Sequence, residues 1–215
     1  VRRLDGMTPV RVSQHGVEQA IRTYTVSDAQ GMSYTQNGHI FYVLTFPTSG
    51  HTWVFDATTR EWHERVSYNL TRWRPCSMAF CYGRNYVQDY ETGKVGYLDP
   101  DTYDEWGVTL RAEWTYGTAA YKGGGRSFHH ELSCQIEAGV GLTSGQGSDP
   151  QIMLDISDDG GRTWRAMTNQ DIGAIGNYRT LVVWNALGSS RDRIYRMAIS
   201  DPVKRAVADT WLEVS

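Results

Sequence analysis

Residues 40–56 read IFYVLTFPTSGHTWVFD, and this stretch decides the fold class. It begins with an uninterrupted run of β-branched, aromatic and aliphatic residues, 40–46, which is typical of a buried strand. A second such run, 51–56, follows across the short segment 48–50. Two strand-like runs joined by so few residues predict an antiparallel hairpin. We therefore expect an all-β fold that builds outward from this hairpin.

A similar pattern recurs about 43 residues further along the chain. In the first copy a strand ends at Asp56, a Thr-containing turn follows, and Trp62 opens the next strand. The second copy has Asp99, Thr102 and Trp106 in the corresponding places. We expect each Asp to accept hydrogen bonds from turn amides and each Trp to fill the space between sheets. A repeat of roughly 40 to 50 residues is the size of a propeller blade. The alternative is two similar hairpins within one sheet.

One segment near the start of the chain predicts a helix. Its apolar residues follow the spacing of a single helix face: Val17, Ala20, Ile21 and Tyr24. Ser13 is a candidate N-cap, and Glu18 would stabilise the first turn through the helix dipole. We expect a helix over residues 13–26 and little helix elsewhere.

The second half of the chain predicts an antiparallel β-sandwich. Apolar and polar residues alternate in segments 128–136, 152–156 and 195–199, and 180–184 and 210–214 are further candidate strands. In the first segment, Phe128 and His130 are expected on the same buried face as Leu132 and Cys134. A boundary near Trp106 and Gly107 would divide the chain into a propeller-like region with the helix, 1–107, and a sandwich, 108–215.

Composition and charge exclude several classes of protein. Of the 215 residues, 40% are hydrophobic and 21% are charged, which argues for a folded chain rather than a disordered one. The formal net charge of -3 gives no electrostatic footprint for tight DNA binding. No apolar run of about 18 residues predicts a membrane-spanning helix. The odd number of cysteines predicts reduced, mostly buried thiols. The chain starts at Val1 without a signal peptide or initiator Met, so we expect a piece of a longer protein.

Residues 157–164, SDDGGRTW, match the Asp-box pattern S-x-D-x-G-x-T-W at every fixed position. The pattern is formed by five residues: Ser157, Asp159, Gly161, Thr163 and Trp164. We expect the Asp to accept turn amides, the Gly residues to adopt positive φ, and the Trp to pack under the hairpin. The motif resembles those of sialidases, which carry several copies, but its role is a local folding device. The neighbouring Asp158 is expected to be a solvated turn former.

The motifs of metal, phosphate and nucleophile chemistry are all incomplete. His130 and Cys134 nearly complete H-E-x-x-H, but that zinc motif needs a helix, and on a strand the two side chains lie roughly 13 Å apart. His130 is then expected to be a core histidine. Cys76 and Cys81 lack metal-ligand spacing. No Ser-His-Asp or Cys-His pair can be argued, and Arg72, Arg74, Arg191 and Arg193 are expected on solvated faces. We expect no catalytic residue, no cofactor and no metal.

Residues 139–150 form a Gly-rich loop, which fails the phosphate-binding pattern because Ser144 occupies the third Gly position. The candidate interface residues in it are Gly139, Gly141, Gly145, Gly147 and Asp149. A segment with so little apolar area is not expected to hold one shape by itself. We therefore expect the loop to be mobile and to order against a neighbouring subunit. The alternative is a flexible hairpin end.

Whole stretches of the sequence carry a family resemblance. They are 38–47, 52–56, 61–65, 137–151, 157–164 and 199–204. Taken together they resemble the packaged-DNA stabilisation protein, a tail accessory factor of short-tailed bacteriophages. The stretches run across most of the chain, and their combination is more specific than any one of them.

The resemblance implies propeller-like blades, closed or incomplete, followed by a β-sandwich. It also implies a ring of copies below the portal and its adaptor, which extends the DNA channel, helps to retain the packaged genome and supports the tail needle and tailspikes. The implied location is the virion tail, with the host cytoplasm during assembly. DNA contact would be non-specific at most, and no membrane is involved. No catalytic residue is implied.

The sequence therefore predicts a non-catalytic structural component of a short-tailed phage tail. The alternative from another class is a glycan-binding or glycan-cleaving propeller of the sialidase type, and a free adhesin module is a third possibility. An enzyme of the sialidase type would need Arg and carboxylate groups that converge in one deep pocket.

Overall fold

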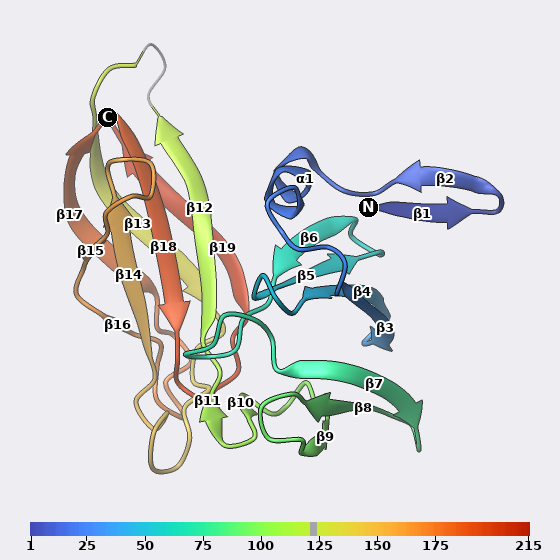
Figure 1. The fold of residues 1–215 in the computed structure, drawn as a ribbon. Coiled ribbons are helices and arrows are strands. Elements are labelled where there is room, and N and C mark those ends of the chain that lie inside the picture. Colours follow the sequence, from blue (N-terminus) through green and yellow to red (C-terminus); the bar gives the residue numbers. More distant parts are fainter. Residues whose placement is uncertain (121–123) are drawn as a thin grey trace. The chain divides into compact units, whose positions relative to one another are not determined.

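The computed structural model describes residues 1–120 and 124–215. Over these residues the fold is nearly all β, with a single short helix (Figure 1). This confirms the predicted fold class. The chain forms two compact units, Val1–Pro100 and Asp101–Ser215. The division after Pro100 comes a few residues before Gly107, where the sequence placed it.

The first unit contains a four-stranded antiparallel sheet. Its strands are β3 (Gln30–Gln36), β4 (His39–Phe46), β5 (His51–Asp56) and β6 (Glu61–Glu64), in that order. The hairpin predicted from residues 40–56 is β4–β5, with Val43 paired to Val54 and both side chains fully buried. Asn37 and Gly38 have positive φ in the tight β3–β4 turn, as short hairpin turns require.

A second, three-stranded sheet follows in the same unit. Its strands are β7 (Pro75–Cys81), β8 (Arg84–Asp89) and β9 (Val95–Tyr97). Strands β3 and β7 lie close together, and the Asn85 side-chain amide donates to the Thr35 carbonyl oxygen at 2.9 Å. Apolar residues of the two sheets form one cluster: Met32, Tyr34, Phe41, Val43, Val54, Trp73, Met78 and Leu98. The two sheets therefore share a core, as neighbouring blades would.

The repeat in the first unit differs from the one read in the sequence. Asp56 accepts the Thr58 amide at 2.8 Å, as expected. Its counterpart is Asp89, which ends β8 and accepts the amides of Glu91 and Thr92 at 3.0 and 3.2 Å. The expected pairing of Asp56 with Asp99 was wrong because β9 is the outer strand of the second sheet. Trp106 opens no strand either, since it has a φ of 52° in the turn between the two-residue strands β10 (Asp104–Glu105) and β11 (Val108–Thr109).

The helix α1 (His15–Ile21) is shorter than the predicted 13–26. Its N-cap is Gln14, which makes no side-chain capping bond, so the prediction of Ser13 was wrong. The Ser13 hydroxyl instead donates to the Glu18 carboxylate at 2.6 Å. Before the helix, β1 (Arg2–Asp5) and β2 (Thr8–Arg11) form a hairpin whose residues are all exposed.

An arginine surrounded by aromatic rings stabilises the core of the first unit. The guanidinium carbon of Arg65 lies 4.8 to 5.7 Å from the ring centroids of Tyr34, Phe41 and Trp73. Arg65 also donates to the Tyr34 hydroxyl. Burial, followed by the neighbouring charge of Arg65, lowers the pKa of His63 to about 4. Cation–π contacts of this kind help to fix the packing of aromatic side chains.

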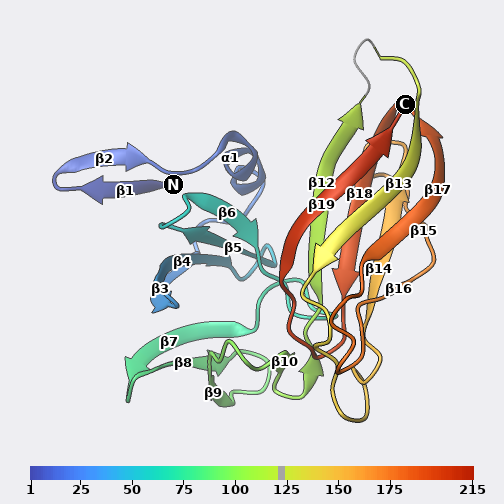
Figure 2. The ribbon, with the colours of Figure 1, turned by 180° about the vertical axis from the view of Figure 1, so that it is seen from behind.

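The second unit is an antiparallel sandwich of two sheets, seen from opposite sides in Figures 1 and 2. One sheet orders β12 (Ala112–Ala120), β18 (Asp192–Ile199), β14 (Gln151–Ser157) and β15 (Arg165–Ala166), with β16 (Gln170–Asp171) also paired to β14. The other orders β17 (Val182–Ser190), β13 (Ser127–Ile136) and β19 (Val207–Val214). The core between them includes fully buried Cys134, Ile152, Leu154, Met197 and Ile199.

A β-bulge in β13 reverses part of its predicted face. The pairing of β13 with both neighbours shifts between His129 and Glu131. A bulge adds one residue to a strand, so the alternation on either side of it falls out of step. As a result His129 is buried, whereas Phe128 and His130 are exposed. The prediction of His130 as a core histidine was wrong, and His129 has that place.

Candidate functional site: turns and loops of the sandwich

The Asp-box residues form the turn between β14 and β15. Asp159 accepts the amides of Arg162 and Thr163 at 2.9 Å each, and the Thr163 hydroxyl at 2.6 Å. The Ser157 hydroxyl donates to Asp159 at 2.8 Å and accepts the Gly161 amide at 2.9 Å. The hydrogen bonds from Thr163, then that from Ser157, hold the pKa of Asp159 well below its ordinary value. The carboxylate is thus engaged entirely within its own turn.

The Trp of the motif packs on the sheet beside the turn. The Arg196 guanidinium lies 4.0 Å above the Trp164 ring and donates to Asp155 at 2.8 Å. Gly161 has a φ of 87°, and a Cβ placed there would lie 3.6 Å from the Trp164 ring. Half-buried Trp164 therefore ties the turn to strand β18 through Arg196.

Separate substitutions of Asp159 and Trp164 should show how much each side chain stabilises the fold. Asp159→Ala should lower the free energy of unfolding, as the loss of a helix cap does, but by less than Trp164→Ala. Trp164→Ala should cost about 2 kcal/mol, below the value for a fully buried Trp because Trp164 is partly exposed. Urea unfolding of the two variants measures both losses. Equal stability of wild type and Trp164→Ala would show that the ring contributes nothing to the turn.

Asp158 and Arg193 form an ion pair that the sequence did not predict. Two nitrogens of Arg193 donate to the two Asp158 oxygens at 2.6 and 2.9 Å, and a third donates to the Leu187 carbonyl at 2.7 Å. Arg193 is only 1% exposed. The expectation of a solvated Arg193 was therefore wrong, whereas Asp158 is exposed as expected and also pairs with Arg193. The adjacent carboxylates of Asp158 and Asp159 in the Asp-box turn therefore bind different partners.

His129 lies in a buried polar network. Its Nδ1 is 2.6 Å from the Tyr195 hydroxyl, and its Nε2 is 3.1 Å from the Ser127 hydroxyl. Burial, then the nearby charge of Arg193, lowers the pKa of His129. Ser127, His129 and Tyr195 are each only 2% exposed, so a substrate cannot reach them. This Ser–His contact satisfies buried polar groups and does not present a nucleophile.

The Gly-rich loop 139–150 packs against its own chain. A Cβ at Gly139 would lie 2.3 Å from the Tyr178 ring, and one at Gly141 would lie 3.0 Å from the backbone of Ala174 and Ile175. Within the loop, the Leu142 amide donates to the Gly147 carbonyl oxygen at 2.7 Å. The loop therefore makes contacts with its own chain that its composition did not predict, because glycine lets backbone segments approach closely. Gly145 and Asp149 are exposed.

A second loop, 173–181, supports the first and was not predicted as part of a site. Gly173 has a φ of 105°, and a Cβ placed there would lie 3.1 Å from the Gly139 amide nitrogen. Ile175 and Tyr178 contact the first loop yet are 59% and 71% exposed, and Leu142 of the first loop is 41% exposed. We call Leu142, Ile175 and Tyr178 the loop patch. The sequence contained one signal for this loop. Large apolar residues stand between its glycines, at positions where a solvated loop would carry polar residues.

Other candidate groups do not converge. Within residues 1–120 and 124–215, no three His, Cys, Asp or Glu side chains lie close enough to hold a metal ion. The three cysteines are free, and only Cys134 is buried, so the expectation of mostly buried thiols was wrong for Cys76 and Cys81. None of the described helices has the length and apolar character needed to cross a membrane.

Comparisons with known proteins match both halves of the chain in order. Residues 1–103 match the model of the bacteriophage P22 Gp10 β-propeller, and residues 113–215 match that of the bacteriophage P22 Gp10 β-sandwich. No curated protein matches the chain. The two matched regions correspond closely to the two compact units.

Proposed function

Because this chain belongs to the bacteriophage P22 Gp10 family, a family of structural phage tail proteins, we propose that it helps to retain packaged DNA. In this proposal copies of the chain form a ring below the portal and its adaptor. The ring extends the DNA channel, contacts the tail needle and tailspikes, and assembles in the host cytoplasm. The ordered match of both halves to one tail protein is the observation that carries the proposal.

The loop patch is a surface of the second unit that suits assembly. Leu142, Ile175 and Tyr178 are large, exposed and held on backbone that is already ordered by glycine contacts. Association through pre-ordered loops loses less conformational entropy than association through mobile ones. We propose that the patch contacts a neighbouring tail subunit, with Gly145 and Asp149 at the exposed tip of the first loop.

The sialidase-type alternative draws on the Asp-box alone. In the turn described above, Asp159 is engaged by Ser157, Arg162 and Thr163. A hydrolase of glycans needs two opposed carboxylates across a cleft. Asp158 and Asp159 instead lie next to each other in one turn. Asp158 pairs with Arg193, and Asp159 binds groups of its own turn. The geometry therefore favours a folding role for the motif over a chemical one.

Ile175→Asp tests the assembly surface. Because Ile175 is 59% exposed, the change should alter the free energy of unfolding by no more than about 0.5 kcal/mol. It should reduce incorporation of the protein into tails at least about tenfold, because it places a charge in an apolar contact. The measurement is the yield of the protein, and of DNA-retaining particles, when the variant complements phage that lack their own copy.

Phe128→Asp is the matched control. Phe128 is also 59% exposed, but it lies on β13 outside the loop patch. It should leave incorporation near the wild-type level. If Ile175→Asp assembled as well as this control, the loop patch would not be a contact in the tail.

A further inference from the structure

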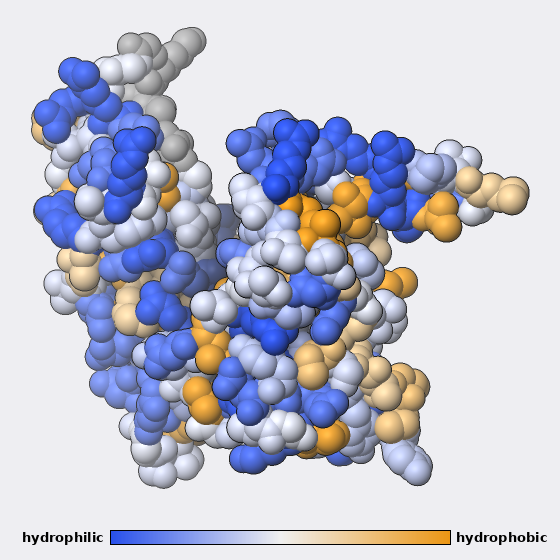
Figure 3. All heavy atoms as spheres, in the orientation of Figure 1, coloured by the Kyte–Doolittle hydropathy of each residue, from blue (hydrophilic) through white to orange (hydrophobic). Residues whose placement is uncertain are grey.

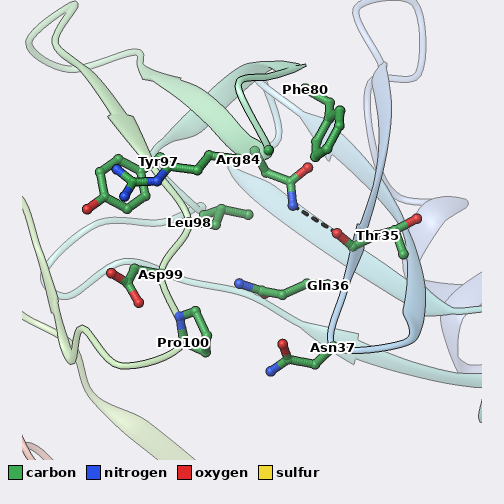
Figure 4. Close-up of a pocket in the computed structure, with 11 residues that line it drawn as sticks. Thr35, Gln36, Asn37, Phe80, Arg84, Tyr97, Leu98, Asp99 and Pro100 are labelled. Atoms are coloured by element: carbon green, nitrogen blue, oxygen red, sulfur yellow. Dashed lines mark hydrogen bonds between the residues drawn. The ribbon is translucent and has the colours of Figure 1, made fainter.

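A pocket of about 400 Å³ lies in the first unit, between the β3–β4 turn and the β7–β8 hairpin (Figure 4). Gln36 and Asn37 come from the first of these and Arg84 from the second. Asp99 and Pro100 follow strand β9. Figure 4 shows Leu98 between these polar side chains, with Gln36 extending from the opposite wall. The pocket thus combines the apolar side chain of Leu98 with amide, guanidinium and carboxylate groups.

The walls of the pocket are held in place by contacts of their own. The Arg84 guanidinium lies 4.3 Å from the centroid of the Tyr97 ring, which in turn contacts Tyr86 edge-on. The side chain of Asn85 bonds to the Thr35 carbonyl oxygen across the two sheets. These contacts fix the distance between the walls, so the pocket is formed before any ligand arrives.

Phe80 stands beside this pocket and extends it. It is 73% exposed, and it also lines a second hollow of about 340 Å³ together with Ser33, Ile40 and Met78. Figure 3 shows apolar side chains at the free end of the β7–β8 hairpin. Thr35, Phe80 and Asn85 line both hollows, and we call the two hollows together the groove.

We propose that this groove binds a short neutral glycan. Sugar rings carry C–H faces that pack on flat aromatic rings, and hydroxyls that bond with planar amides, guanidinium and carboxylate groups. Phe80 supplies the stacking face. Gln36, Asn37, Arg84 and Asp99 supply the hydrogen-bonding groups on the rim. This binding lies in the first unit, is separate from the Asp-box, and does not depend on the assembly function proposed above.

The same groups fit other ligands less well. A nucleic acid would need several cations along its phosphates, whereas the lining of the pocket holds a single cation, Arg84, and an acid, Asp99. A hydroxyl-rich ligand uses the donors and acceptors that are present.

The test is glycan binding by the full chain, measured by isothermal titration with a panel of short neutral oligosaccharides that includes maltohexaose and chitohexaose. Phe80→Ala should weaken the Kd about tenfold, and Arg84→Gln should weaken it several-fold, with unchanged melting temperatures because both side chains are exposed. Tyr82→Ala is the matched control. Tyr82 is 94% exposed in the same hairpin but does not line the pocket, so its loss should leave Kd unchanged.

Three results would overturn the proposal. The first is no binding by any member of the panel. The second is binding that Phe80→Ala leaves as it was, or that Tyr82→Ala weakens equally. The third is tighter binding of a single-stranded oligonucleotide than of any glycan, which would assign the groove to a nucleic acid.

Discussion

Replacing Asp89 by Ala should lower the free energy of unfolding of the first unit by about 3–5 kcal/mol. Asp89 is completely buried and forms a bidentate ion pair with Arg74, which is itself 7% exposed. It also accepts the amides of Glu91 and Thr92 in the following turn. The variant would leave the Arg74 charge buried beside the space that Asp89 occupied, and a buried charge without its partner is among the costliest defects in a fold.

Asp56→Ala is the control for this prediction. Asp56 caps the equivalent turn of the first sheet, but the side chain next to its carboxylate is the partly exposed His39, whose Nδ1 lies 2.6 Å away. Its loss should cost about 1 kcal/mol, the value of a cap. Urea unfolding gives both losses. Equal losses would show that Arg74 adds nothing to the role of Asp89.

Acid should reduce the difference between wild type and Asp89→Ala. Burial acts to raise the pKa of Asp89, but the hydrogen bonds from Arg74 and Thr92 outweigh it and hold the pKa well below its ordinary value. A carboxyl whose pKa is depressed by folding contributes stability above its unfolded pKa of about 4 and loses it as pH falls. The gap between the two proteins should therefore be full at neutral pH and narrow below about pH 4.

Asp158→Ala should destabilise the second unit by about 2–3 kcal/mol. The change removes the carboxylate that faces the Arg193 guanidinium, whose side chain is only 2% exposed. In the variant Arg193 would keep its hydrogen bond to the Leu187 carbonyl oxygen and its contact with Tyr195. The expected loss is smaller than for Asp89 because the Asp158 side chain is 46% exposed and water can take its place.

Glu137→Ala separates this effect from the loss of a surface charge. Glu137 is exposed to nearly the same extent, 44%, and pairs with Lys204, whose side chain is 55% exposed. Exposed ion pairs contribute about 0–1 kcal/mol. Both losses are measured by thermal or urea unfolding. If the two variants lost the same stability, burial of Arg193 would not strengthen the contribution of its ion pair with Asp158.

The strands of the two units could be predicted from two different patterns: an unbroken run of β-branched and aromatic residues in the first unit, and alternation with a period of two in the second. The run 40–56 became β4 and β5, and the alternation in 152–156 and 195–199 became β14 and β18. Side chains at alternate positions of a strand share a face, so burial of one face leaves a direct trace in the sequence.

The bulge in β13 could not be recognised from the alternation of side chains in the sequence. Phe128, His130 and Leu132 alternate as if they shared one face, yet one inserted residue near His130 puts His129 inside instead. A bulge depends on pairing with β17 and β19, which are far away in the sequence. The buried network of Ser127, His129 and Tyr195 could not be predicted for the same reason.

The loop 139–150 shows a further limit. Its composition predicted mobility because few of its side chains can be buried. Its order comes from backbone that glycine lets approach Tyr178 and residues 174–175, a contact between segments distant in sequence. Likewise the ion pairs of Asp89 with Arg74 and of Asp158 with Arg193 join residues that only the folded sheets bring together.

The central claim is that this chain works as a structural subunit of a phage tail around the DNA channel. Imaging the tail of purified particles by single-particle electron microscopy tests it most directly. The account predicts density for both units, repeated around the tail axis below the portal and adaptor, with the loop patch against a neighbouring subunit. Particles that retain their DNA but show no density for either unit in the tail would contradict it.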